Sequence, residues 1–121
     1  MKPSDSNIVR TKSKNFALRC IKLRRYMVEE KKEYELSKQV LRSGTSIGAN
    51  IKEAIRGQSR ADFGAKMNIA LKEASETEYW LELLTESEYL TNEEGESMLQ
   101  DCRELIKLLT SIVKKTFESE D

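Results

Sequence analysis

The chain has 121 residues, of which 35% are charged and 38% hydrophobic, and its 21 basic and 21 acidic side chains give no net charge. This length fits one domain, and the lack of histidine excludes paired-histidine zinc sites, Ser-His-Asp triads and Glu-x-x-His di-iron pairs. No stretch approaches the ~20 apolar residues of a membrane span, and no apolar signal segment is seen, so we expect a cytoplasmic protein without membrane contact.

The first predicted helix covers about residues 13–30. Phe16, Cys20, Leu23 and Met27 form its apolar stripe at helical spacing. The charged residues 31–34 are expected to form a turn. Cys20 and Cys102 lie far apart and outside any Cys-x-x-Cys motif, so we expect both to be buried free thiols.

The second predicted helix covers about residues 35–56 and ends before Gly57. Its apolar stripe includes Gly44, and Gly44 and Gly48, one turn apart, remove side chains from one face. With the other poor helix formers of this segment they cost about 3 kcal/mol. A close approach of a second backbone would offset this cost. The pattern therefore predicts a packing site against another helix, in the same chain or in another subunit.

A polar stripe borders the apolar face of this second helix, at Ser46, Asn50 and Glu53. Asn50 lies nearest the apolar seam and is expected to need a buried partner. Glu73 and Glu76 in the next helix are the candidates.

The third predicted helix covers about residues 60–87, with Ser59 as N-cap and Asp62 in its first turn. Its apolar residues follow a heptad seam. Trp80, Ile69 and Leu83 lie outside that seam. They widen the apolar arc either because the helix touches two neighbours in its own bundle or because it forms a subunit interface. The seam consists of Phe63, Met67, Ala70, Ala74, Thr77, Leu81 and Leu84.

The fourth predicted helix opens with a capping box, Thr91 with Glu94, and runs to about Phe117. Four long helices joined by short turns predict an all-α fold, an antiparallel up-down-up-down four-helix bundle. The turn signals argue against one extended coiled coil. We expect a single domain over residues 1–121, with flexible ends at about 1–6 and 118–121.

Charge is divided between the halves of the chain. Residues 1–60 hold 15 Lys/Arg and 6 Asp/Glu, a net charge of +9, whereas residues 61–121 hold 6 and 15, a net charge of −9. Either the basic helices pair with the acidic ones, or the first helix carries a strip that binds a polyanion such as RNA. The candidate strip is Lys12, Lys14, Arg19, Lys22, Arg24 and Arg25.

The spacing of Glu73 and Glu76 also resembles half of the magnesium site of all-α nucleotide pyrophosphohydrolases. The second half, Glu-x-x-Asp on a following helix, is missing, since the only match is Glu118 to Asp121. We therefore expect no metal, no cofactor, no catalytic residues and no enzymatic activity.

Three segments carry a resemblance to a known family. They are residues 39–54 (QVLRSGTSIGANIKEA), residues 59–63 (SRADF) and residues 72–81 (KEASETEYWL). Together they resemble the four-helix-bundle family of 23S rRNA intervening-sequence proteins, over about residues 16–113.

This resemblance implies a homopentamer around a central opening and no enzymatic activity. A related branch, the accessory variability proteins of diversity-generating retroelements, binds reverse transcriptase and nucleic acid through a basic surface. We therefore expect a non-enzymatic homo-oligomeric scaffold associated with RNA or with a nucleic-acid-handling protein. The alternative is a protein–protein adaptor without nucleic-acid binding. Gly44, Ser46, Gly48, Asn50, Glu53, Glu73, Glu76 and Trp80 are the candidate packing and interface residues.

Overall fold

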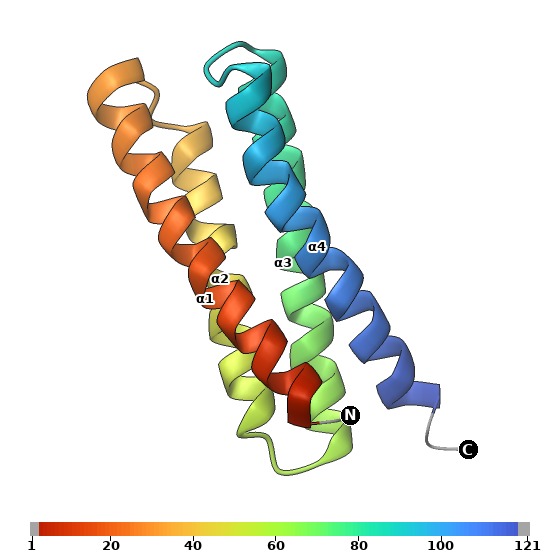
Figure 1. Cartoon of the computed structure of the whole chain (residues 1–121). Coiled ribbons are helices and arrows are strands. Elements are labelled where there is room, and N and C mark those ends of the chain that lie inside the picture. Colours follow the sequence, from red (N-terminus) through yellow and green to blue (C-terminus); the bar gives the residue numbers. More distant parts are fainter. Residues whose placement is uncertain (1–2, 119–121) are drawn as a thin grey trace.

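The computed structural model describes residues 3–118, which form four long α-helices and one π-helical turn (Figure 1). The predicted all-α fold is confirmed. The elements are α1 (Pro3–Tyr26), the π-helical turn η1 (Met27–Lys31), α2 (Leu36–Ile55), α3 (Arg60–Glu86) and α4 (Asn92–Glu118).

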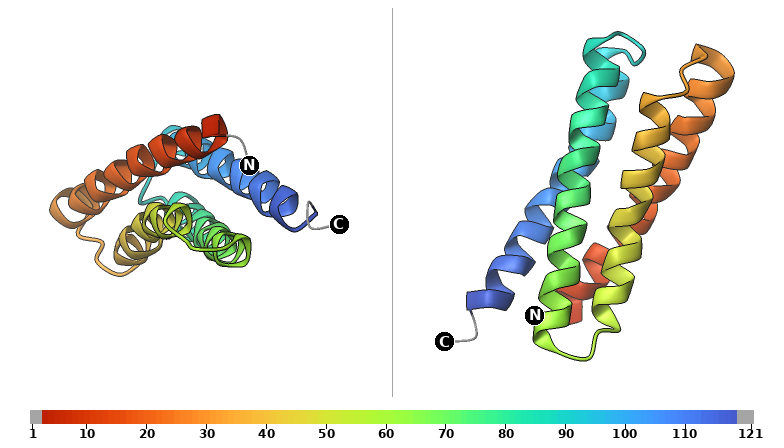
Figure 2. Two further views of the ribbon diagram at one scale, coloured as in Figure 1. Left: turned by 90° about the horizontal axis from the view of Figure 1, so that it is seen from below. Right: turned by 180° about the vertical axis from the view of Figure 1, so that it is seen from behind.

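Successive helices run antiparallel, as predicted for an up-down-up-down bundle. The α1–α2 and α3–α4 turns lie at one end, and the α2–α3 turn lies at the other end with both ends of the described chain (Figures 1 and 2). Helix α2 packs along α3, α3 along α4 and α1 along α2, whereas α1 and α4 contact each other less. The bundle is thus closed most tightly on its α2–α3 side.

One apolar core fills the space between the helices. The seam predicted for α3 is buried from Met67 to Leu84, and Phe63 is partly buried at its start. Both cysteines are buried and free, as predicted. The largest fully buried apolar side chains are Phe16, Met27, Ile47, Ile51, Met67, Leu81, Leu84, Leu105, Leu109, Val9 and Val40.

Helix α1 begins at Pro3, about ten residues before the predicted start. Val9 and Ser13 are 0% and 1% exposed, so they continue the buried stripe of Phe16 toward the N-terminus. The prediction was wrong because Val9 and a Ser, set among mostly polar residues, give little periodic apolar signal. The flexible ends expected at 1–6 and 118–121 fall partly on residues 1–2 and 119–121, which lie outside the described residues; residues 3–6 and 118 are helical.

A buried carboxylate organises the turn between α1 and α2. Glu33 is 6% exposed, and its two oxygens accept hydrogen bonds from the backbone N–H groups of Glu35, Leu36 and Ser37 at 2.8–2.9 Å. These donors belong to the start of α2, which has no other partner for them. The turn reaches this geometry through Lys32, whose φ of 55° is left-handed.

The remaining turns follow their predicted signals. The Ser59 hydroxyl accepts from the Asp62 N–H at 3.0 Å, and Thr91 and Glu94 form the reciprocal capping box at 2.9 and 3.1 Å. Helix α2 ends before Gly57, whose N–H donates to a carbonyl of the last turn, but Gly57 does not adopt a positive φ. No helix in residues 3–118 has the length and apolar character needed to cross a membrane.

Candidate functional site

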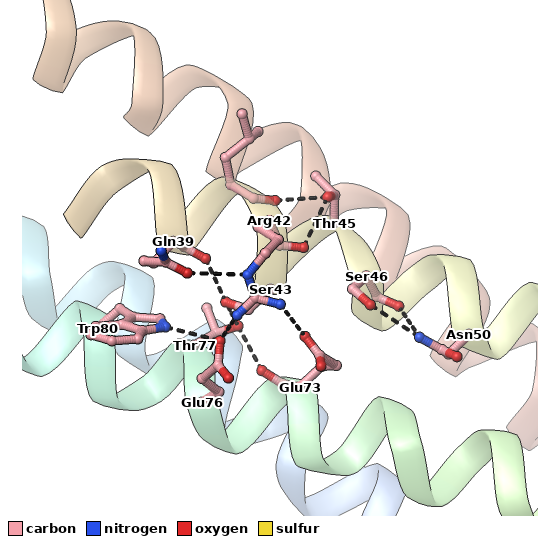
Figure 3. Close-up of polar contacts among 11 residues, drawn as sticks. Gln39, Arg42, Ser43, Thr45, Ser46, Asn50, Glu73, Glu76, Thr77 and Trp80 are labelled. Atoms are coloured by element: carbon pink, nitrogen blue, oxygen red, sulfur yellow. Dashed lines mark hydrogen bonds and ion pairs between the residues drawn. The ribbon is translucent and has the colours of Figure 1, made fainter. Parts of the chain in front are cut away.

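A polar network joins α2 to α3 on the surface of the bundle (Figure 3). Arg42 of α2 pairs with both Glu73, at 3.3 Å, and Glu76 of α3, and its Nε donates to Gln39 at 3.1 Å. The Glu76 carboxylate also accepts a hydrogen bond from the Trp80 indole N–H at 3.1 Å. One guanidinium therefore holds two carboxylates and, through Glu76, fixes the Trp80 ring.

A pair of buried hydroxyls lies beneath this network. The oxygens of Ser43 and Thr77 are 2.7 Å apart across the α2–α3 contact, and both residues are fully buried. Each hydroxyl also lies within 2.8 Å of the carbonyl one turn earlier in its own helix. Because both partners must meet inside the core, the pair fixes the register of α2 against α3.

The partnership predicted for Asn50 is wrong. Its side-chain amide donates to the carbonyl and hydroxyl oxygens of Ser46, one turn earlier in the same helix, at 2.9 and 3.0 Å (Figure 3). Arg42 takes the place opposite Glu73 and Glu76 that the sequence analysis assigned to Asn50. Arg42 precedes Ser46 by one turn, so extending the polar stripe by one turn toward the start of α2 would have identified the partner.

Glu53, at the far end of the stripe, forms an ion pair with Lys66 of α3 at 3.4 Å. Both side chains are largely exposed, so this pair contributes little stability. The stripe therefore serves as the polar border of the α2–α3 contact, and Glu53 connects it to α3.

The glycines of α2 face α1 of the same chain. A Cβ at Gly44 would lie 2.4 Å from Cys20 Sγ, and one at Gly48 would lie 3.4 Å from Ser13 Oγ. The close approach predicted from the glycine spacing is therefore made within the subunit. It is tight only at Gly44.

The predicted basic strip is divided by the structure, because three of its six cations have partners. Lys12 pairs with Glu104 and Arg19 with Asp101, each at 2.6 Å, which ties α1 to α4. Arg24 donates to the Tyr34 carbonyl and the Ser37 hydroxyl, so it supports the α1–α2 turn; these hydrogen bonds are 2.5 and 2.8 Å long.

The other three cations, Lys14, Lys22 and Arg25, form no ion pair within residues 3–118. All three are exposed on α1, and Arg10 joins them as an exposed cation that sequence reasoning left out of the strip. Exposed apolar side chains lie between these cations: Leu18 is 51% and Ile21 39% exposed. We call Arg10, Lys14, Lys22 and Arg25 the α1 cation face.

In the described part of the chain, no three Cys, Asp or Glu side chains are grouped closely enough to hold a metal ion. Glu73 and Glu76 instead share the Arg42 guanidinium. A cation already pairs with both carboxylates at the position where the pyrophosphohydrolase resemblance would place magnesium.

The chain is similar to proteins of one family. A family model described as 23S rRNA-intervening sequence protein matches residues 5–111. A crystal structure of a protein of unknown function from the S23 ribosomal protein family of Bacteroides thetaiotaomicron is 59% identical, covers 91% of this chain and 98% of that chain, and superposes with a TM-score of 0.89. No curated protein matches the chain significantly.

Proposed function

Because the chain belongs to the 23S rRNA-intervening sequence protein family, we propose that it is a non-enzymatic, homo-oligomeric scaffold that associates with RNA in the cytoplasm. The observation that carries the RNA association is the α1 cation face. Its four exposed cations have no ionic partner in the described structure, so they are available to phosphates. The proposal requires no cofactor.

Self-association is supported by the outer face of α3. Ile69 is 40% and Tyr79 54% exposed, and the partly buried Trp80 and Leu83 lie on the same helix. An exposed apolar face of this kind is stabilised when a second subunit covers it. The family resemblance favours a ring of five subunits. A ring repeats the α1 cation face, so weak contacts to one RNA add up.

The absence of enzymatic activity is part of the same proposal. Glu73 and Glu76 are bound by Arg42, and the second acidic motif of the pyrophosphohydrolases is missing from the sequence. Incubation with magnesium and nucleoside triphosphates should therefore release no phosphate or pyrophosphate. Turnover that Glu73→Gln or Glu76→Gln abolishes would contradict it.

The test of RNA association is a salt titration of binding to a single-stranded RNA, followed by fluorescence anisotropy. Lys22→Gln/Arg25→Gln removes two unpaired cations, whereas Lys12→Gln/Arg19→Gln removes two that are paired with α4. Both double variants lose the same charge. We expect the first to lower affinity about 10-fold, the second to lower it much less, and wild-type binding to fall steeply with salt.

One observation favours a second function, a protein–protein adaptor. Lys12 and Arg19 are already paired with α4, so part of the charge contrast between the two halves of the chain is satisfied inside the bundle. An adaptor would bind no RNA at low salt and would use the apolar face of α3 for another protein. If no RNA binds at low salt in the titration, the adaptor function takes the place of the proposed RNA association.

A further inference from the structure

We infer that a groove between α1 and α2, at the level of Gly48, is a binding site for a phosphate group. The groove has a volume of about 340 Å³. Arg10 and Lys14 of α1 and Lys52 of α2 line it, and we call it the α1–α2 groove. The inference deepens the proposed RNA association, since it names where a phosphate is held.

The charge around the α1–α2 groove is of one sign. Arg10, Lys14 and Lys52 are exposed and form no ion pair within the part of the chain that is described, and no carboxylate lines the groove. Cations gathered around one concave surface repel each other and raise the local positive potential. An anion in the groove relieves this repulsion, and a phosphate accepts several hydrogen bonds from guanidinium and ammonium groups at once.

Apart from the three cations and Ile51, the residues that line the groove are small, and we call them its floor: Ser13, Ala17, Thr45, Gly48 and Ala49. A Cβ at Gly48 would meet its nearest neighbour, Ser13 Oγ, at 3.4 Å, an ordinary contact distance. Packing against α1 therefore does not require glycine at this position, although glycine costs a helix about 1 kcal/mol relative to alanine. Packing therefore does not explain the glycine at position 48, whereas the need to keep the groove floor open does.

The hydroxyls at the floor already have acceptors. Ser13 Oγ donates to the Arg10 carbonyl at 3.1 Å, and Thr45 Oγ1 donates to the Leu41 carbonyl at 2.7 Å. Recognition of the phosphate therefore falls to the three cations. Because their heads are exposed to solvent, the groove can accept either a phosphodiester within an RNA chain or a free phosphate.

The experiment compares two double variants with the same loss of charge. Lys14→Gln/Lys52→Gln removes two groove cations, and Lys38→Gln/Lys107→Gln removes two exposed cations elsewhere. We expect the first to weaken binding of a single-stranded RNA at least about 5-fold and to reduce the salt slope by about 0.7, which is the contribution of the one phosphate held in the groove. The second should change affinity less than about 2-fold. Gly48→Leu fills the floor with every cation kept, and should weaken binding as the groove variant does.

A titration of the wild-type protein with inorganic phosphate, at constant ionic strength, separates the two sources of phosphate. Amide chemical shifts should move around residues 13–17 and 45–49. Suppose that RNA binds, but that Lys14→Gln/Lys52→Gln has the same affinity for it as Lys38→Gln/Lys107→Gln. The groove is then wrong and RNA association stands. The same conclusion follows if Gly48→Leu binds RNA as tightly as the wild type does. If RNA does not bind but inorganic phosphate moves these amides, the groove stands and RNA association fails. If neither ligand acts, both fail.

Discussion

At the scale of single residues, substitution of alanine for the two glycines of α2 should have opposite effects on stability. A methyl group at Gly44 would lie 2.4 Å from Cys20 Sγ, whereas one at Gly48 has its nearest contact at 3.4 Å. We expect Gly44→Ala to lower the free energy of unfolding by about 1–2 kcal/mol, because overpacking outweighs the helix-propensity gain. Gly48→Ala should raise it by about 0.5–1 kcal/mol. Urea denaturation followed by circular dichroism measures both.

The control for Gly44→Ala is the double variant with Cys20→Ala. Removal of the sulfur makes room for the new methyl group, so the double variant should be more stable than the sum of the two single changes predicts. If Gly44→Ala lowers the free energy of unfolding equally in the wild-type and the Cys20→Ala backgrounds, the new methyl group clashes with a group other than Cys20.

The two thiols are buried, and burial raises the pKa of Cys20 and of Cys102 to about 12. The reactive species is the thiolate, which at pH 8 is then a minute fraction of each. We expect a disulfide reagent to modify the native protein only as fast as the bundle opens. The rate should rise with urea in parallel with unfolding. Rapid modification of either cysteine in the absence of denaturant would contradict this burial.

At the scale of elements, the start of α2 depends on Glu33. Burial alone would raise the pKa of Glu33, but hydrogen bonds from the backbone N–H groups of Leu36, Ser37 and Glu35 outweigh it and lower the pKa below the ordinary value. We expect Glu33→Gln to lower the free energy of unfolding at pH 7 by about 1–2 kcal/mol, because a neutral amide is a weaker acceptor at a helix N-terminus. Thermal or urea unfolding measures this loss.

The same measurement across pH tests the charge of Glu33. Its pKa is lower in the folded state than in the unfolded chain, where it is about 4.3. The stabilisation is therefore complete above about pH 4.3 and is lost as the pH falls through the folded pKa. The difference between wild type and Glu33→Gln should shrink in that range. If the difference in free energy of unfolding stays constant down to pH 2, Glu33→Gln destabilises the protein for steric reasons and not through the lost charge.

Elements with local end signals were predicted accurately from the sequence. Ser59 and the pair Thr91 and Glu94 mark helix starts by hydrogen bonds to residues three positions away, so the boundaries of α3 and α4 follow from short segments. The role of Glu33 was not predictable in this way. Its carboxylate reaches α2 only because Lys32 adopts a left-handed conformation, which no residue preference indicates.

The candidate site was predicted in part. The stripe of Ser46, Asn50 and Glu53 does border the α2–α3 contact, and Glu76 does meet α2 there. The partner of Glu76 is Arg42, however, because the register of the two helices is set by the buried Ser43–Thr77 pair. Such a register depends on contacts between distant segments, and one sequence does not specify it.

At the scale of the whole molecule, basic residues of the first half of the chain form ion pairs with acidic residues of the second half within the bundle. Lys12 and Arg19 pair with α4, and Arg42 pairs with α3, so these three cations join the basic half to the acidic half. Each exposed pair is worth little by itself. Together they favour the alignment of the two helical hairpins, and they leave the α1 cation face and Lys52 of the α1–α2 groove available to a partner.

The last prediction concerns assembly, which the proposed function requires. Wild-type protein should elute as an oligomer in size-exclusion chromatography with light scattering. Ile69→Lys/Tyr79→Lys should convert it to a subunit of 14.0 kDa, because both side chains are exposed in the single chain and a charge there prevents another subunit from covering α3. Helix content should not change, since neither side chain belongs to the core. Leu18→Lys, on the exposed face of α1, is the matched control and should leave the oligomer intact. If Leu18→Lys dissociates the assembly and the α3 variant does not, the subunits meet through α1 and the α3 interface is wrong.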